Sequence, residues 1–190
     1  MSGESSQKSI SKAFPINMPV VVEILLLLFL GALAVTLRAK LRTPINTPGH
    51  HGLEVMAIFI IGRYITGFKF GSSISSLAAA LLIFVPVIGI KDPFLPVIYL
   101  LMGVTIDMMF YLLKNKKFPI LIFGVIGAIA YSVIPLSRLI ITLLTKYPYG
   151  AFVKHGYLTP VITHILFGLA GGLLGAGLVF SIKKLKLFNK

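Results

Sequence analysis

The sequence predicts an all-α integral membrane protein, a compact bundle of six transmembrane helices with both termini in the cytoplasm. Of the 190 residues, 57% are hydrophobic and 12% are charged, whereas a soluble domain carries about 25% charged residues. Long apolar segments recur along the chain. They are apolar on all sides, unlike barrel strands, which alternate over about ten residues. Cysteine is absent, which excludes disulfides, thiolate metal sites and iron–sulfur clusters.

A transmembrane helix needs about 20 mostly apolar residues. Six segments meet or approach this length: 18–37, 53–66, 71–90, 94–113, 118–144 and 159–182. The second segment is the shortest and barely reaches across a bilayer. Residues 1–17 are polar and rich in Ser and Lys, so we expect a disordered cytoplasmic tail there. One membrane domain then covers 18–185, and a basic tail covers 186–190.

The amino terminus also has features of a cleavable signal peptide. Lys8 and Lys12 precede a Leu-rich stretch, and Ala-Leu-Ala at 32–34 imitates a cleavage site. However, the apolar run is long for a signal peptide, and it contains Glu23. A retained first helix is the favoured interpretation.

The excess of basic residues indicates orientation in the membrane. The chain contains eighteen basic and five acidic residues, which gives a net charge of +13. In a soluble chain this excess would suggest nucleic acid, but in a membrane protein it sits in loops and sets topology. Eleven basic residues fall on the side of the termini and six on the other side. The positive-inside rule therefore places both termini in the cytoplasm, and no nucleic-acid partner is expected.

The first external loop, residues 38–54, contains two prolines and two glycines that forbid a continuous helix. His50 and His51 lie in it next to Glu54. These side chains are either solvated or in contact with a ligand, and a metal site lacks two further ligands of suitable type. The fifth loop carries three tyrosines, ordinarily interfacial residues, which could cover a pocket together with the first loop: Tyr147, Tyr149 and Tyr157.

Ionisable residues at membrane depth are functional candidates, because burying them in lipid is costly. Asp107, Arg138 and His164 lie within the fourth, fifth and sixth segments. If the fourth and fifth segments run outward and the sixth inward, all three come near one level in the outer half. They then form either a polar pocket that opens outward, or a structural Asp107–Arg138 ion pair with His164 bonded to a carbonyl. Glu23 lies away from this level and serves helix packing or a partner contact.

Small residues form faces that allow close helix packing. The sixth segment carries Gly168-x-x-x-Gly172 and Gly171-x-x-x-Gly175. Such faces pack inside one bundle or against another subunit.

A Walker A loop, the motifs of common hydrolases and paired intramembrane aspartates are absent from the sequence. We therefore expect neither an enzyme nor a bound cofactor, and a haem would need paired histidines where only His164 is clearly intrahelical.

Two stretches, together with the six-segment count, carry a resemblance to a known family. Residues 43–52 read Thr-Pro-Ile-Asn-Thr-Pro-Gly-His-His-Gly, and residues 70–89 begin Phe-Gly-Ser-Ser, end Pro-Val-Ile-Gly and are followed by Asp-Pro at 92–93. The chain resembles the substrate-binding S components of energy-coupling factor (ECF) transporters. That resemblance implies vitamin or micronutrient uptake across a bacterial or archaeal cell membrane. It also implies an outer pocket closed by the first loop, and association with a transmembrane coupling subunit and two ATPases.

The residues themselves, together with the resemblance, predict roles for particular positions. The metal-specific branch begins with Met-His, which this chain lacks, so an organic solute is favoured. The predicted substrate-binding residues are His50, His51, Glu54, Asp107, Arg138 and His164. The predicted docking residues are Ala32, Thr36, Ser72 and Ser76. The alternative function is a homo-oligomeric channel or small secondary transporter that self-associates through the glycine faces.

Overall fold

The computed structural model describes residues 19–41, 47–113 and 120–184. These parts are helical and contain no strand, which confirms the all-α prediction for them. The elements are α2 (Val20–Lys40), α3 (Gly52–Ile65), α4 (Gly71–Ile83), η1 (Pro86–Ile88), α5 (Leu95–Leu113), α6 (Ile120–Thr145), α7 (Gly150–His155) and α8 (Leu158–Lys184). The predicted tails at 1–17 and 186–190 lie outside the described residues.

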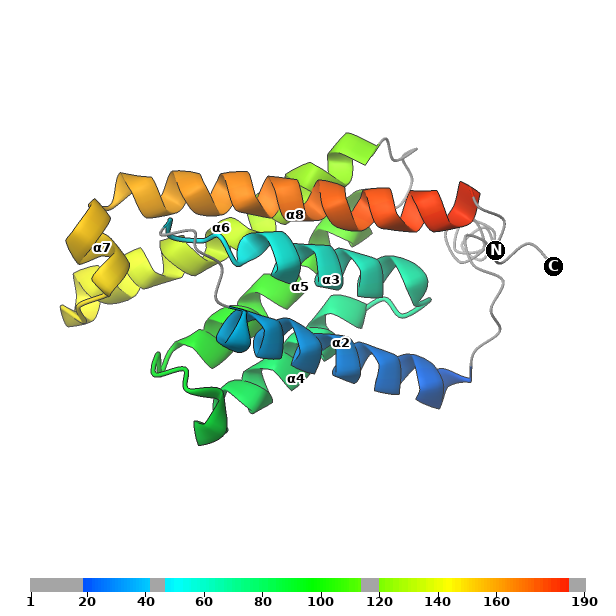
Figure 1. Ribbon diagram of the computed structural model, residues 1–190, viewed down its shortest axis with the longest axis horizontal. Helices are drawn as coiled ribbons and strands as arrows, with labels where there is room; N and C mark the ends of the chain where they lie inside the picture. The colour runs from blue at the N-terminus through cyan, green and yellow to red at the C-terminus, as the bar shows by residue number, and fades with distance from the viewer. Residues whose placement is uncertain (1–18, 42–46, 114–119, 185–190) are drawn as a thin grey trace.

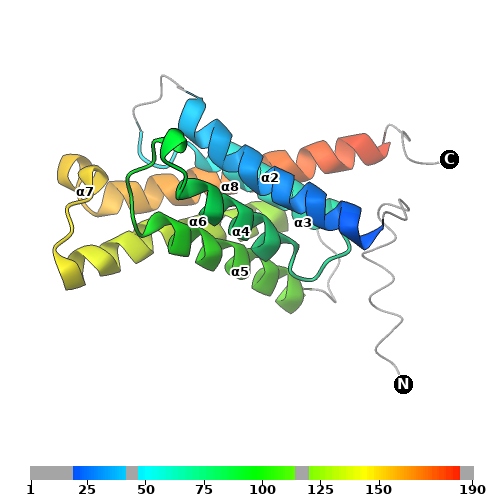
Figure 2. The same ribbon diagram turned by 90° about the horizontal axis from the view of Figure 1, so that it is seen from below.

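The six longer helices run alternately up and down one bundle (Figures 1 and 2). Helices α2, α4 and α6 run from one end, which we call the tail end, to the other, which we call the loop end. Helices α3, α5 and α8 run back, so α2 begins and α8 ends at the tail end. The short helix α7 lies at the loop end between α6 and α8.

Among the described residues, four helices are long and apolar enough to cross a membrane: α2, α5, α6 and α8. This supports a multi-pass membrane protein. Helices α3 and α4 are shorter, with 14 and 13 residues. The prediction of one continuous segment over 71–90 is too long at its carboxyl end. Helix α4 ends at Ile83, and a separate 3₁₀ turn follows at Pro86–Ile88. Proline disfavours helical backbone in the residue before it, and Val85 is extended.

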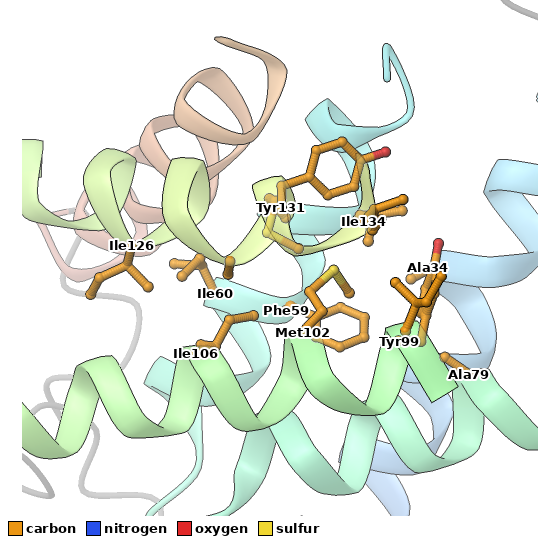
Figure 3. Packing of buried hydrophobic residues seen from close by; sticks show 14 of the residues in the cluster. Ala34, Phe59, Ile60, Ala79, Tyr99, Met102, Ile106, Ile126, Tyr131 and Ile134 are labelled. Atoms are coloured by element: carbon orange, nitrogen blue, oxygen red, sulfur yellow. The ribbon is translucent and has the colours of Figure 1, made fainter. Parts of the chain in front are cut away.

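The core lies at the centre of the bundle, where α2, α3, α4, α5, α6 and α8 all contribute buried apolar residues (Figure 3). Helix α5 contributes Tyr99, Met102 and Ile106, which are fully buried together with Phe59 of α3 and Tyr131 of α6. The outer faces of the helices expose large apolar side chains instead. This arrangement suits lipid, because lipid tails are as apolar as leucine.

The glycine faces of α8 are used inside the bundle. A Cβ atom on Gly172 would collide with the carbonyl oxygen of Phe123 in α6, and one on Gly171 would collide with the carbonyl oxygen of Gly52 in α3. A Cβ on Gly175 would lie 2.6 Å from the carbonyl oxygen of Ala57. Because only glycine allows this approach, these residues seat α8 against α3 and α6.

The predicted docking residues differ in accessibility. Ser72 and Ser76 are both 0% exposed, and a Cβ on Gly103 would collide with the Ser76 side chain. The predicted Ser72–Ser76 docking face is therefore wrong, because these serines let α4 pack closely on α5. Thr36 is exposed and Ala32 is half-buried on α2, so those two remain on the surface.

Candidate functional site

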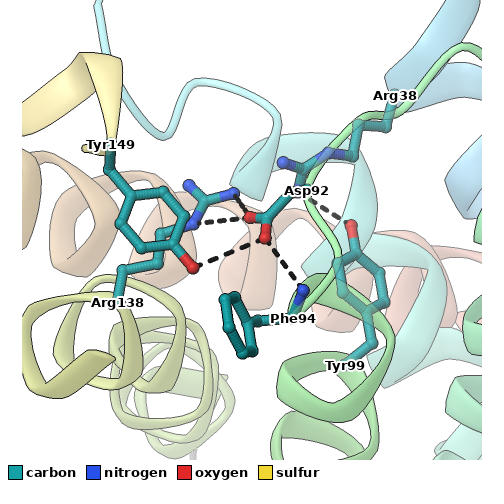
Figure 4. A network of polar contacts seen from close by, with 6 residues as sticks. All are labelled: Arg38, Asp92, Phe94, Tyr99, Arg138 and Tyr149. Atoms are coloured by element: carbon teal, nitrogen blue, oxygen red, sulfur yellow. Dashed lines mark hydrogen bonds and ion pairs between the residues drawn. The ribbon is translucent and has the colours of Figure 1, made fainter. Parts of the chain in front are cut away.

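Asp92 lies at the centre of a polar network at the loop end (Figure 4). Its Oδ2 accepts hydrogen bonds from Nε and Nη2 of Arg138, at 3.1 and 2.7 Å. Its Oδ1 accepts from the backbone N–H of Phe94 at 3.1 Å and from the Tyr149 hydroxyl at 3.4 Å. Because the Arg138 bonds are charge-assisted, they are the strongest links between α6 and the segment before α5.

Local sequence explains why these groups meet. Asp92 precedes Pro93 and the first turn of α5, where an aspartate readily accepts the N–H two residues on. Arg138 lies in the last turns of α6, and Tyr149 precedes α7, with its ring 5.1 Å from the Arg138 guanidinium carbon. Burial, reinforced by the Asp92 carboxylate, raises the pKa of Tyr149 to about 12. The hydroxyl therefore stays protonated and can donate to Asp92.

Arg38 forms the second part of this network. It lies in the last turn of α2, and its Nη1 donates to the Tyr99 hydroxyl of α5 at 3.0 Å. The guanidinium carbon lies 5.6 Å from the centre of the Tyr99 ring. Figure 4 shows this pair beside Asp92, and the Asp92 carboxylate acts electrostatically on Arg38. We call Arg38, Asp92, Tyr99, Arg138 and Tyr149 the loop-end cluster.

The described part of the first loop, residues 47–54, packs over buried aromatic residues close to this cluster. Gly49 has φ +82°, and a Cβ there would lie 2.6 Å from Nδ1 of His164. The ring of His164 stacks on Tyr131, with centroids 5.0 Å apart and an interplanar angle of 23°. A Cβ on Gly52 would collide with the Tyr131 ring. The two glycines thus allow the loop to close on His164 and Tyr131.

His164 itself is buried, 4% exposed, and its Nδ1 donates to the carbonyl oxygen of Pro160 at 2.6 Å. This confirms the prediction of a histidine bonded to a carbonyl. Arg38 and Arg138 both act electrostatically on His164. His164 therefore lies near the two arginines of the loop-end cluster, but it is not one of the five members of that cluster.

The other predicted loop residues pair with one another. His51 Nδ1 lies 2.6 Å from Glu54 Oε1, an ion pair when the imidazole is protonated. His50 Nδ1 lies 2.8 Å from the Thr47 carbonyl oxygen, and the two imidazole rings are 3.9 Å apart. Across the residues that the structure describes, no three His, Asp or Glu side chains are arranged to hold a metal ion.

Asp107 lies elsewhere, and the predictions for its position and its pairing with Arg138 are wrong. Its carboxylate accepts hydrogen bonds from the backbone N–H groups of Ser72 and Ser73, at 3.1 and 2.8 Å, and from Ser73 Oγ at 2.7 Å. It also forms an ion pair with Arg63. The fourth segment runs from the loop end to the tail end, opposite to the direction assumed. Asp107 is therefore about 18 Å along α5 from Leu95, at 1.5 Å per residue.

Sequence reasoning missed Arg38, Asp92 and Tyr99 as members of the site. Arg38 counts as one of several basic residues at a segment boundary, and Tyr99 lies within an apolar segment. The scarcity of acidic residues was a usable signal. Only five occur, and Asp92 is the one acidic residue between the third and fourth segments. It would be expected to pair with a nearby arginine.

The loop-end cluster and its neighbours can recognise a polar solute. Two guanidinium groups, tyrosine hydroxyls and one carboxylate supply hydrogen-bond donors, acceptors and charge within a short distance. Aromatic rings of Tyr131 and His164 supply flat surfaces. Comparison of the chain with models of known protein families, with curated proteins and with solved structures gave no match.

Proposed function

We propose that this chain is the substrate-capture membrane subunit of an ATP-driven importer, and that it binds a small polar solute at the loop end. The observation that supports this function is the loop-end cluster lying next to residues that the first loop covers. Gly49 and Gly52 of that loop contact His164 and Tyr131. If the termini are cytoplasmic, this end faces outward, where an importer first meets its solute.

The distribution of polar groups favours binding at one end over a continuous pathway. The loop-end cluster connects α2, α5, α6 and the segment before α7, whereas the Arg63–Asp107 pair connects α3 and α5 at the tail end. Between them lies the apolar core around Met102 and Ile106. A channel needs a path that water can enter between its two ends, which a packed apolar core does not provide, whereas a capture subunit needs polar groups only where the solute binds.

Energy for import would come from partner proteins. The chain carries no Walker A motif, so the proposal includes a transmembrane coupling subunit and two ATPase subunits. A docking surface on α2 would include Ala32 and Thr36, whose hydroxyl donates to the Ala32 carbonyl oxygen of its own helix at 2.8 Å. That bond leaves the outer side of Thr36 free to pack against a partner helix.

The alternative, a homo-oligomeric channel or secondary transporter, depended on the glycine faces for self-association. Gly168, Gly171, Gly172 and Gly175 instead pack against α3 and α6 in the same chain. The feature that favoured the alternative is therefore used within the monomer.

Purification of the tagged chain from its native membranes in a mild detergent tests the proposal. Recovery of a single copy with a membrane subunit and two ATPases supports it, and a stable symmetric oligomer without ATPases contradicts it. Thr36→Leu should reduce the recovered ATPase at least severalfold. Thr105→Leu is the matched control, because Thr105 is also bonded to its own helix, through the Leu101 carbonyl at 2.8 Å, but lies on α5.

A further inference from the structure

Among the residues that the structure describes, no acidic side chain is paired with Arg38. The sequence contains five acidic residues. Three form ion pairs: Glu54 with His51, Asp92 with Arg138, and Asp107 with Arg63. Glu23 lies in the first turn of α2, at the tail end, and Glu4 lies outside the described residues. Within the described parts, no carboxylate lies at ion-pair distance from Arg38.

Within the described parts of the chain, Arg38 also has unused hydrogen-bonding capacity. A guanidinium group has five N–H donors, and the bond that the structure gives for Arg38 is the one to Tyr99. Asp92 is near, but its oxygens already accept bonds from Arg138, Tyr149 and the N–H of Phe94. The loop-end cluster thus contains two guanidinium groups and one carboxylate, and it carries one uncompensated positive charge.

We infer that the solute captured at the loop end is an anion, and that Arg38 binds its carboxylate or phosphate group; this inference rests on the proposed function. Arginine binds carboxylate and phosphate in a bidentate manner, which suits a half-buried side chain with several free donors. The partly desolvated surroundings strengthen such an interaction. The rings of Tyr99, Tyr131 and His164 lie close by and suit the organic part of the solute.

An anionic oxygen group at this position has two possible sources. Arg38 lies at the end of a membrane-length helix, where lipid phosphates also lie, so a lipid headgroup offers the same chemistry as a free solute. We assign the free solute, because Arg38 points to Tyr99 and Asp92 within the bundle (Figure 4). The experiment must separate the two sources.

Thermal unfolding in a neutral sugar detergent, followed by the amount of chain that stays soluble and monodisperse after heating, tests the inference. This readout needs neither tryptophan nor cysteine, which the chain lacks, and it is unaffected by probes that absorb ultraviolet light. The probes are benzoate, nicotinate and inorganic phosphate, with benzamide and nicotinamide as neutral counterparts, all at equal ionic strength. At least one anion should raise the unfolding midpoint by about 2–4 °C, whereas the amides should not.

The rise should disappear in Arg38→Gln and persist in Lys40→Gln, which removes an exposed charge two residues away. Arg38→Lys keeps the charge and should retain part of the effect, which keeps the test informative if Arg38→Gln folds poorly. No rise with any anion, an equal rise with the amides, or a rise that survives in Arg38→Gln would each overturn the inference. So would an Arg38-dependent rise seen only on adding phosphatidylglycerol, which would identify a lipid headgroup.

The outcome is independent of the importer test. If the ATPases co-purify but no anion stabilises the chain, the importer proposal stands and the anionic solute is wrong. If anions stabilise the chain through Arg38 but no ATPase co-purifies, binding at the loop end is correct and the importer proposal fails.

Discussion

Arg63 and Asp107 form an ion pair across α3 and α5, with Nε of the arginine 3.0 Å from Oδ1 of the aspartate. The N–H is not aimed at that oxygen closely enough for a hydrogen bond, so the attraction is mainly electrostatic. The carboxylate also accepts the backbone N–H groups of Ser72 and Ser73 at the start of α4. Asp107 therefore ties three helices together at the tail end.

Replacing this carboxylate should destabilise the bundle without changing the loop end. In Asp107→Asn, Arg63 keeps its charge in a site where it is only 13% exposed, and loss of its partner should cost about 3 kcal/mol. Reversible unfolding in mixed detergent micelles measures this cost. Glu23→Gln is the control and should change stability by less than about 0.5 kcal/mol. An unchanged unfolding free energy in Asp107→Asn would show that the pair contributes nothing.

Asp92→Asn should lower stability but raise affinity for anions. The substitution weakens two charge-assisted bonds to Arg138, at a cost of about 1–3 kcal/mol. It also frees the positive charge of Arg138 beside Arg38, so the affinity for an anionic probe should rise by about tenfold. Titration of benzoate against the unfolding midpoint measures the affinity. Asp107→Asn makes the same charge change at the tail end, and it should leave the affinity for benzoate unaltered. Weaker anion binding in Asp92→Asn would contradict the charge argument.

Gly49→Ala should destabilise closure of the first loop on His164. Alanine at φ +82° costs about 1–2 kcal/mol, and its Cβ would press on the imidazole. Gly89→Ala is the matched control, because Gly89 has φ +75° but nothing lies within 4 Å of its Cβ position. The loop should become more sensitive to proteolysis in Gly49→Ala than in Gly89→Ala. Equal sensitivity would show that the contact with His164 does not hold the loop.

Gly172→Ala should separate α8 from α6. The added methyl group would collide with the Phe123 carbonyl oxygen, so the helices must move apart, at a cost of about 1–3 kcal/mol. Gly177 lies on the same helix, with nothing within 4 Å of its Cβ position. Gly177→Ala should therefore be neutral, or stabilising by up to about 1 kcal/mol. Reversible unfolding in mixed micelles compares the two variants. An equal loss of unfolding free energy in Gly172→Ala and Gly177→Ala would refute the close packing of α8 on α6.

The apolar pattern predicted the long helices well. Segments 94–113, 118–144 and 159–182 match α5, α6 and α8 to within two residues at each end. The third segment failed at its carboxyl end because hydrophobicity continues through Pro86, although the helix does not. Hydropathy reports what contacts lipid or core, and it does not report where the backbone can remain helical.

The candidate site was only half predictable. Arg138 and His164 stand out because they are polar residues inside apolar segments. Arg38 and Asp92 sit at segment boundaries, where charges are common. The contacts that define them join residues 61 and 46 positions apart. Asp107 was misplaced because a position within a segment gives depth only when the direction of that segment is right.

The early end of α4 has a consequence for the surrounding membrane. Thirteen residues span about 20 Å, whereas the hydrocarbon core of a bilayer is about 30 Å thick. Leu77, Leu81 and the following Phe84 are exposed, so the outward face of this short helix is open to lipid, whereas the longer helices α2 and α5 pack against its other side. Lipid beside α4 has to thin to match it, at a cost that grows with each ångström of mismatch. The chain should therefore be more stable in vesicles of short-chain phosphatidylcholine than in long-chain ones.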